Sequence, residues 1–149
     1  MESQIRFSSI LGHEYREELE ELMFFNPQQR RAISGINHSI SEYGVPSIIA
    51  DGDRLRIKVD GLAETQTLYA LDHSSDRPVL AGVMVYVRSD AENIVLLHIA
   101  VKEDYSRMGK HAEEMLVLRL MTQLRRIARM IKGVRAITLK YSSGLVIPV

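Results

Sequence analysis

The residues best suited to chemistry lie in a turn that precedes a long segment with an apolar stripe. Gly109 allows a ligand to approach the backbone closely, and Arg107, Lys110 and His111 add positive charge, the histidine only when protonated. Backbone N–H groups in the first turn of a helix have no partner inside it, and the helix dipole adds partial positive charge. A helix that begins here predicts a site for a phosphate or another anion. The alternative is a capped helix that binds nothing.

Other chemistries find less support in the 149 residues. There is no cysteine, which excludes disulfides, thiolate nucleophiles and cysteine-ligated metals and favours a reducing compartment. The five histidines show no tight spacing with carboxylates of the kind that zinc or iron sites use. No nucleophile triad can be assembled. We therefore expect no metal site.

Composition predicts one domain over residues 1–149. The 46% of hydrophobic and 26% of charged residues are typical of soluble globular chains. No apolar run approaches the roughly 20 residues that cross a bilayer, and the N-terminus lacks the pattern of a signal peptide. We expect a cytoplasmic protein without a membrane partner.

Hydrophobic periodicity predicts helices first and strands afterwards. Residues 12–43 have apolar side chains at helical spacing, and Asn26-Pro27 divides them into two helices. Residues 55–59 alternate apolar and charged side chains, which predicts a strand with one exposed face near a sheet edge. Three further runs, separated by polar turns, predict an antiparallel meander whose last run is covered on both faces. These runs are residues 67–72, 78–88 and 93–101.

The C-terminal third predicts a helix and a returning strand. Residues 109–132 carry one apolar stripe, and Gly133 ends the helix. Residues 134–141 then return parallel to the central strand through a right-handed crossover. The apolar tail 145–149 forms a last strand at the sheet edge, alone or with a partner chain. The expected fold is α+β, with a mixed, mostly antiparallel central sheet flanked by helices and a β-loop-α-β unit.

This order of elements resembles the GNAT superfamily of N-acetyltransferases between about Thr67 and Tyr141. The segment from Leu97 to Ala112 carries the resemblance: a strand that ends in Ala-Val, an acidic-Tyr segment with a following Arg, and a Gly turn that enters a helix. The resemblance implies a single GNAT-like domain. Its implied activity is transfer of an acetyl or other acyl group from acyl-CoA to an amine, which the sequence does not identify.

The resemblance also implies a cofactor site. The pyrophosphate of acetyl-CoA or another acyl-CoA would lie at the Gly turn, and the pantetheine would contact the main chain of Ile99, Ala100 and Val101. Ser106 and His111 stand where the family pattern has Gln or Arg and Gly or Ala. These substitutions support an alternative function, a catalytically inactive interaction or regulatory module that forms dimers. The implied turn residues are Ser106, Arg107, Met108, Gly109, Lys110, His111 and Ala112.

The family positions also indicate residues for proton transfer. Tyr141 ends the returning strand near the implied thioester and is the candidate acid, and Glu103 in the turn is a candidate base acting through water. His98 has the opposite strand parity from the positions that carry the family's base. We therefore expect it to face away, as a hydrogen-bonded core or edge histidine.

The nineteen basic and nineteen acidic residues are segregated along the chain. Residues 105–140 hold nine Lys or Arg and two Glu. The remaining residues hold ten Lys or Arg and seventeen Asp or Glu. A long amphipathic helix normally carries charge on its wet side, and no aromatic residues are interleaved to stack bases, so nucleic-acid binding is disfavoured. The expected partner of these cations is the acidic N-terminal helix, within the molecule or across a homodimer.

Overall fold

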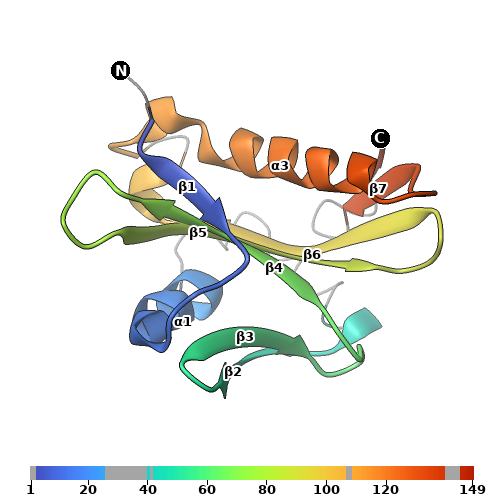
Figure 1. The fold of residues 1–149 in the computed structure, drawn as a ribbon, viewed down its shortest axis with the longest axis horizontal. Coiled ribbons are helices and arrows are strands. Elements are labelled where there is room, and N and C mark those ends of the chain that lie inside the picture. The colour runs from blue at the N-terminus through green and yellow to red at the C-terminus, as the bar shows by residue number, and fades with distance from the viewer. Residues whose placement is uncertain (1–2, 26–39, 41, 107–108, 140–144) are drawn as a thin grey trace.

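A mixed sheet forms the centre of the molecule. The computed structural model describes residues 3–25, 40, 42–106, 109–139 and 145–149. The sheet strands, in spatial order, are β1 (Ile5–Ser8), β4 (Gln66–Asp72), β5 (Val79–Arg88), β6 (Asn93–Val101), β7 (Ala136–Leu139) and β8 (Leu145–Pro148) (Figure 1). Strands β6 and β7 are parallel, and every other neighbouring pair is antiparallel. The expected α+β class, the meander and the C-terminal strand are confirmed.

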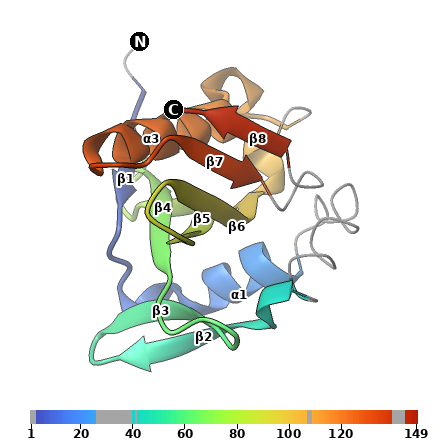
Figure 2. The same ribbon diagram turned by 90° about the vertical axis from the view of Figure 1, so that its right-hand side faces the viewer.

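Different elements cover the two faces of the sheet. Helix α3 (Leu116–Met130) lies on one face. Helix α1 (Arg16–Phe24), the 3₁₀ turn η1 (His13–Tyr15) and the hairpin of β2 (Pro46–Asp51) and β3 (Arg54–Val59) lie on the other (Figures 1 and 2). The sheet therefore separates two apolar cores, one under α3 and one under α1 and the hairpin.

Strand β3 has the alternation that its sequence predicts. Its apolar residues Leu55, Ile57 and Val59 are buried, and the charged residues between them are exposed. The strand belongs to the separate β2–β3 hairpin, however, and does not flank the main sheet. Strands β1 and β2 were not expected from the sequence. The second helix expected after Asn26-Pro27 lies largely outside the described residues.

Helix α3 carries the expected buried stripe but starts later than expected. Met115 has a left-handed backbone with φ of 50°, which a non-glycine residue seldom adopts and which cannot continue a helix. The helix therefore starts at Leu116 and not at Gly109. No helix in the described ranges is both long enough and apolar enough to cross a membrane. The stripe consists of Leu116, Leu120, Leu124 and Ala128.

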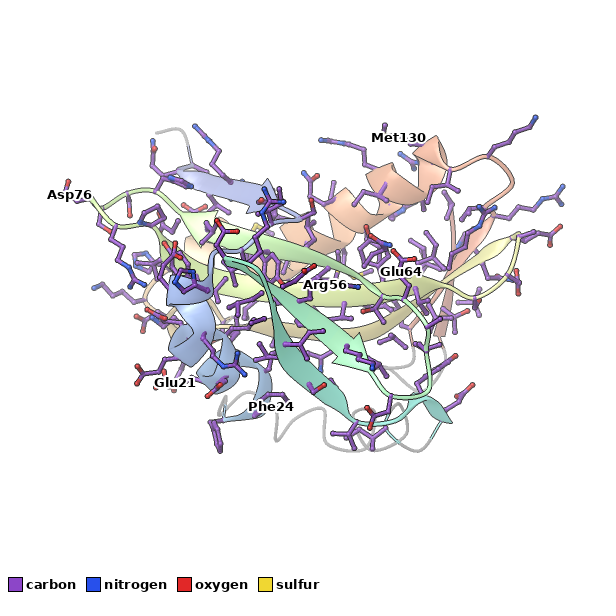
Figure 3. The ribbon with its side chains drawn as sticks, turned by 60° about the horizontal axis from the view of Figure 1, so that its bottom comes forward. Glu21, Phe24, Arg56, Glu64, Asp76 and Met130 are labelled. Atoms are coloured by element: carbon purple, nitrogen blue, oxygen red, sulfur yellow. The ribbon has the colours of Figure 1, made fainter. Side chains whose placement is uncertain are left out.

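The expected contact between the basic helix and the acidic helix does not occur within the molecule. Helices α1 and α3 lie on opposite faces of the sheet, and Figure 3 shows Glu21 of α1 and Met130 of α3 on opposite sides. The acidic helix pairs with other cations, and Arg77 approaches Glu18 to 2.8 Å. On α3, Arg119 binds the nearby Glu114 at 2.9 Å. The sheet thus keeps the two charged helices apart.

Truncation of the α3 stripe should destabilise the protein strongly. Leu124 is completely buried, so Leu124→Ala should lower the free energy of unfolding by about 2–5 kcal/mol through lost apolar burial and a cavity. Leu118 lies on the same helix but is 59% exposed, so Leu118→Ala should change the free energy of unfolding by less than about 0.5 kcal/mol. Urea unfolding measures both values. Equal effects would contradict this arrangement of the helix.

Candidate functional site

A break in the pairing of β5 with β6 determines which side chains reach the α1 side of the sheet. Val85 pairs with His98, but the next residue, Tyr86, pairs with Leu96, so Leu97 is an extra residue in β6. Such a bulge redirects side chains, and bulges are over-represented next to active sites. Leu97 and His98 consequently line the same cavity, whereas Ile99 packs into the core under α3. The expectation that His98 faces away from that side is wrong, because simple alternation fails at the bulge.

We call the space beside these residues the His98 cavity. It has a volume of about 210 Å³. Its described walls come from the end of α1, residues 40, 44 and 45 before β2, the open end of the β2–β3 hairpin, and strands β5 and β6. Figure 3 shows Phe24 at the end of α1 beside the hairpin. Among the described lining residues, His98 is the one titratable side chain. The lining residues are Met23, Phe24, Ile40, Gly44, Val45, Pro46, Val59, Val85, Leu97 and His98.

Burial controls the protonation of His98. The residue is 7% exposed, and desolvation lowers the pKa of its imidazole from 6.5 to about 4. At neutral pH the ring is therefore uncharged. The expected position of His98 in the core is confirmed by this burial, whereas its direction could not be predicted, because the bulge leaves no signal in the local hydrophobic pattern.

Strand β6 is longer than its described pairing with the parallel strand β7. The described pairs run from Asn93 and Ala136 to Leu96 and Leu139, where the described part of β7 ends, while β6 continues to Val101. We call residues 97–101 of β6 the β6 extension. It starts at the bulge and contains the expected cofactor-contact residues Ile99, Ala100 and Val101, and its first two residues, Leu97 and His98, line the His98 cavity.

The connection from β6 to α3 is a compact loop with its own hydrogen bonds. It contains two 3₁₀ turns, η3 (Glu103–Tyr105) and η4 (Ala112–Glu114). The N–H groups of Gly109, His111 and Ala112 donate to carbonyl groups within the loop, and Ser106 is held by the carbonyl of Glu103. The backbone donors that the sequence assigned to an anion are thus largely used inside the loop.

Gly109 serves the packing of this loop. A Cβ atom at Gly109 would overlap the carbonyl oxygen of Glu103 and the carbonyl group of Asp104. The glycine therefore lets two parts of the loop approach each other. This differs from the expected close approach of a ligand at the first turn of a helix, because α3 starts only at Leu116.

Three side chains, which we call the Asp72 clamp, hold the loop to the end of β4. The buried phenol of Tyr105 donates to the Asp72 carboxylate, which also accepts the N–H of Ser74 at 2.9 Å. The ring of His111 stacks on Tyr105 with 4.8 Å between centroids. Burial by itself raises the pKa of Asp72, but the hydrogen bonds from Tyr105 and Ser74 and the nearby His111 lower it below its usual value.

The remaining predicted site residues are dispersed. Lys110 is exposed on the loop. Glu103 lines a different cavity, of about 650 Å³, between α1 and η3. Tyr141, Arg107 and Met108 lie outside the described residues. Within the described part of the chain, no group of three His, Asp or Glu side chains is placed to hold a metal ion. We call the larger cavity the acidic groove, because it is lined by Glu17, Glu18, Glu20, Glu21, Glu103 and Asp104 together with Leu22, Phe25, Leu80 and Lys102.

Burial of His98 should make stability depend on pH in a defined window. Because its folded pKa of about 4 lies below the unfolded value of 6.5, the unfolded chain binds a proton first as pH falls. The protein should therefore lose stability between these two values, by up to about 1.4 kcal/mol per pH unit. Urea unfolding of the protein and of His98→Gln at pH 7 and 5 measures this, and the stability advantage of the parent should shrink at pH 5. An unchanged difference would contradict a neutral buried imidazole.

Loss of the Tyr105 hydroxyl should weaken the Asp72 clamp. Tyr105→Phe leaves the buried Asp72 carboxylate short of a donor, so the free energy of unfolding at pH 7 should fall by about 1–3 kcal/mol. Because the carboxylate is stabilised only when ionised, this loss should diminish as pH falls through the pKa of Asp72. Tyr86→Phe is the control in thermal unfolding, since Tyr86 is a partly exposed tyrosine on β5. A pH-independent loss would show that the clamp acts through packing alone.

The comparisons with known proteins indicate no family, so the function is inferred from the geometry described above. No protein-family model matches the chain, and a comparison with curated proteins finds no match either.

Proposed function

We propose that the protein is an acyltransferase of the GNAT type, which moves an acetyl or other acyl group from acyl-CoA to an amine. One observation carries this proposal: β6 continues to Val101, beyond its last described pairing with the parallel strand β7 at Leu96, and its chain then enters the loop. An open strand edge can bind an extended ligand through main-chain hydrogen bonds. The amide-containing pantetheine arm of acyl-CoA has this chemistry.

The loop beyond β6 would hold the phosphate end of the donor. Lys102 directly follows β6 and Lys110 follows Gly109. Both side chains are exposed, so their ammonium groups can reach an anion in solvent. Because the N–H groups of Gly109 and His111 are used within the loop, side-chain charge has the larger role in this site. The Asp72 clamp holds this loop, which directly follows the β6 extension, against the end of β4.

A second candidate function is an interaction or regulatory module without catalysis. The internally bonded loop supports it, since a pyrophosphate site built on the backbone requires N–H groups that point outward. The substituted positions Ser106 and His111 agree with this alternative. The two functions differ in whether acyl-CoA binds at all.

Calorimetric titration with acetyl-CoA tests the transferase proposal. We expect micromolar binding by the parent protein and about tenfold weaker binding by Lys110→Glu, a change of about 1.4 kcal/mol. Lys110 is preferred to Gly109 as the test position, because any side chain at Gly109 would disrupt the loop itself. Lys58→Glu, an equal charge reversal at an exposed position of β3, is the matched control and should bind like the parent.

Two results would overturn parts of this proposal. If the parent does not bind acetyl-CoA, desulfo-CoA or CoA, the interaction module becomes the function that the geometry supports. If Lys110→Glu and Lys58→Glu weaken binding equally, the loop cation does not contact the donor, and binding reflects only the overall charge.

A further inference from the structure

We propose that the outer side of α3 binds the outer side of α1 from a second copy of this chain, so that copies associate head to tail. This inference is independent of the proposed transferase function, because it uses neither the loop after β6 nor the β6 extension. It follows from the charges of the two helices, their exposed apolar side chains and their places on opposite faces of the sheet.

The outer side of α3 is basic and contains no acidic residue. Residues 115–135 include neither Asp nor Glu. Among the arginines of α3, Arg119 alone has an ion pair within the described part of the chain. The exposed residues follow one another at intervals of three and four positions and therefore lie along one side of the helix. We call this surface the α3 face, and it consists of Leu118, Thr122, Arg125, Arg126 and Arg129.

The outer side of α1 is acidic. Arg77 pairs with Glu18 at 2.8 Å, and Arg16 pairs with Glu20 at 3.1 Å. No ion pair between described residues involves the exposed carboxylates that lie between these two along the helix and on its next turn. Figure 3 shows Glu21 at the periphery of the molecule. We call this surface the α1 face, and it consists of Glu17, Glu21, Phe24 and Phe25.

Both faces also expose apolar side chains, and these lie at one end of each face. Nine large apolar side chains are exposed among the described residues, and six of them lie on these two helices or directly beside them. Exposed apolar groups gathered in this way are typical of interaction sites. The six are Phe24 and Phe25 at the end of α1 and Met115, Val117, Leu118 and Met130 on or next to α3.

The spacing of charged and apolar residues is the same on both faces. Leu118 precedes Arg125 by seven residues, and Glu17 precedes Phe24 by seven residues. At a rise of 1.5 Å per residue, each pair spans about 10.5 Å along its helix. Antiparallel packing therefore places Leu118 against Phe24 and Arg125 against Glu17. Parallel packing would place a carboxylate against Leu118 and a guanidinium against Phe24, so the antiparallel arrangement is favoured.

The sheet determines how such an assembly grows. Helices α1 and α3 cover opposite faces of the sheet (Figures 1 and 2), so a copy that binds its neighbour through α3 directs its own α1 away from that neighbour. The contact is therefore heterologous, because it joins different surfaces of two copies. It leaves one face unused at each end, and further copies can add there. A closed two-fold dimer cannot form through this contact.

The contact is small and depends on charge. The two faces belong to helices of 9 and 15 residues, and each face is one side of its helix. Interfaces that bury less than about 1,200 Å² are typical of weak and transient complexes. Salt screens the attraction between exposed charges. We therefore expect association at high protein concentration and low ionic strength, and its loss when salt is added.

Sedimentation velocity of the full chain at pH 7 is the first test. At about 0.02 M salt the average mass should rise with protein concentration beyond that of a dimer, and at about 0.5 M salt it should fall to that of the monomer. A chain that stays monomeric at low salt would overturn the proposal. A dimer that grows no further would also overturn it, because a heterologous contact leaves both ends open.

A pair of neutralised variants tests the two faces directly. Arg125→Gln with Arg129→Gln neutralises the α3 face, and Glu17→Gln with Glu21→Gln neutralises the α1 face. All four residues are exposed, so both variants should unfold at the temperature of the parent. Each variant alone should remain monomeric at low salt. An equimolar mixture should form complexes of two copies and none larger, because one variant keeps its α1 face and the other keeps its α3 face.

Two results of this experiment would contradict the proposal. The first is a mixture that does not associate, and the second is either variant growing alone like the parent. Arg54→Gln with Lys58→Gln removes two charges from exposed positions of β3 and is the matched control, which should associate like the parent. Equal loss of association in this control would show that overall charge, and not the α3 face, is responsible.

Introduced thiols test the orientation, because the chain has no cysteine of its own. Phe25 is 76% exposed and follows Phe24, so its replacement leaves the His98 cavity unchanged. In antiparallel packing, Leu118→Cys mixed with Phe25→Cys should form disulfide-linked dimers at least about tenfold faster than Leu118→Cys mixed with Glu17→Cys, since a disulfide requires close approach of the two Cα atoms. The reverse order of rates would contradict the antiparallel contact.

An anionic lipid surface is the competing partner for a basic helix face. Vesicles of phosphatidylcholine with phosphatidylserine are added to the parent at low salt, and vesicles of phosphatidylcholine alone are the control. Binding to the anionic vesicles by a chain that does not associate with itself would assign the α3 face to lipid and overturn the proposal.

Discussion

The arrangement of the candidate site depends on one extra residue in the pairing of β5 with β6. Without the bulge at Leu97, strict alternation would direct His98 toward the α3 core, where an imidazole would lie among Leu and Ile side chains. With it, the histidine and the preceding leucine share one cavity under α1 and the hairpin. The described β6–β7 pairing ends at Leu96, the residue before the bulge, so the cavity and the β6 extension meet at this local irregularity.

The loop that follows β6 is held by contacts that differ in kind from those of the sheet. A buried phenol–carboxylate hydrogen bond ties it to β4, and a glycine lets its two segments touch. Both contacts hold described residues of the loop in place without a ligand. Contacts of this kind reduce the conformational entropy that a loop loses on binding, which favours affinity for a ligand that fits it.

Local periodicity predicted the elements that bury one face or one stripe. Strand β3, strand β6 and the stripe of α3 follow their hydrophobic patterns, because burial of alternate or i, i+4 residues is a property of each segment alone. The bulge could not be predicted in this way, since it is a property of two strands paired together. The late start of α3 has a similar origin, because Gly109 is needed for a contact with Glu103 that the local sequence does not reveal. The sequence therefore placed Gly109 in the connection between strand and helix, but it did not predict that this glycine serves contacts within the loop.

The placement of α1 and α3 on opposite faces has an electrical consequence for the whole molecule. The chain has no net charge, yet glutamates dominate one helix and arginines the other, with the sheet between them. The charges of these two helices contribute a dipole component directed across the sheet. Near pH 7 the chain has no net charge, so net repulsion between copies does not oppose attraction between opposite charged surfaces. Because salt screens charges over about 10 Å at 0.1 M ionic strength, the colloidal behaviour of the protein depends on ionic strength more than its neutral total charge suggests.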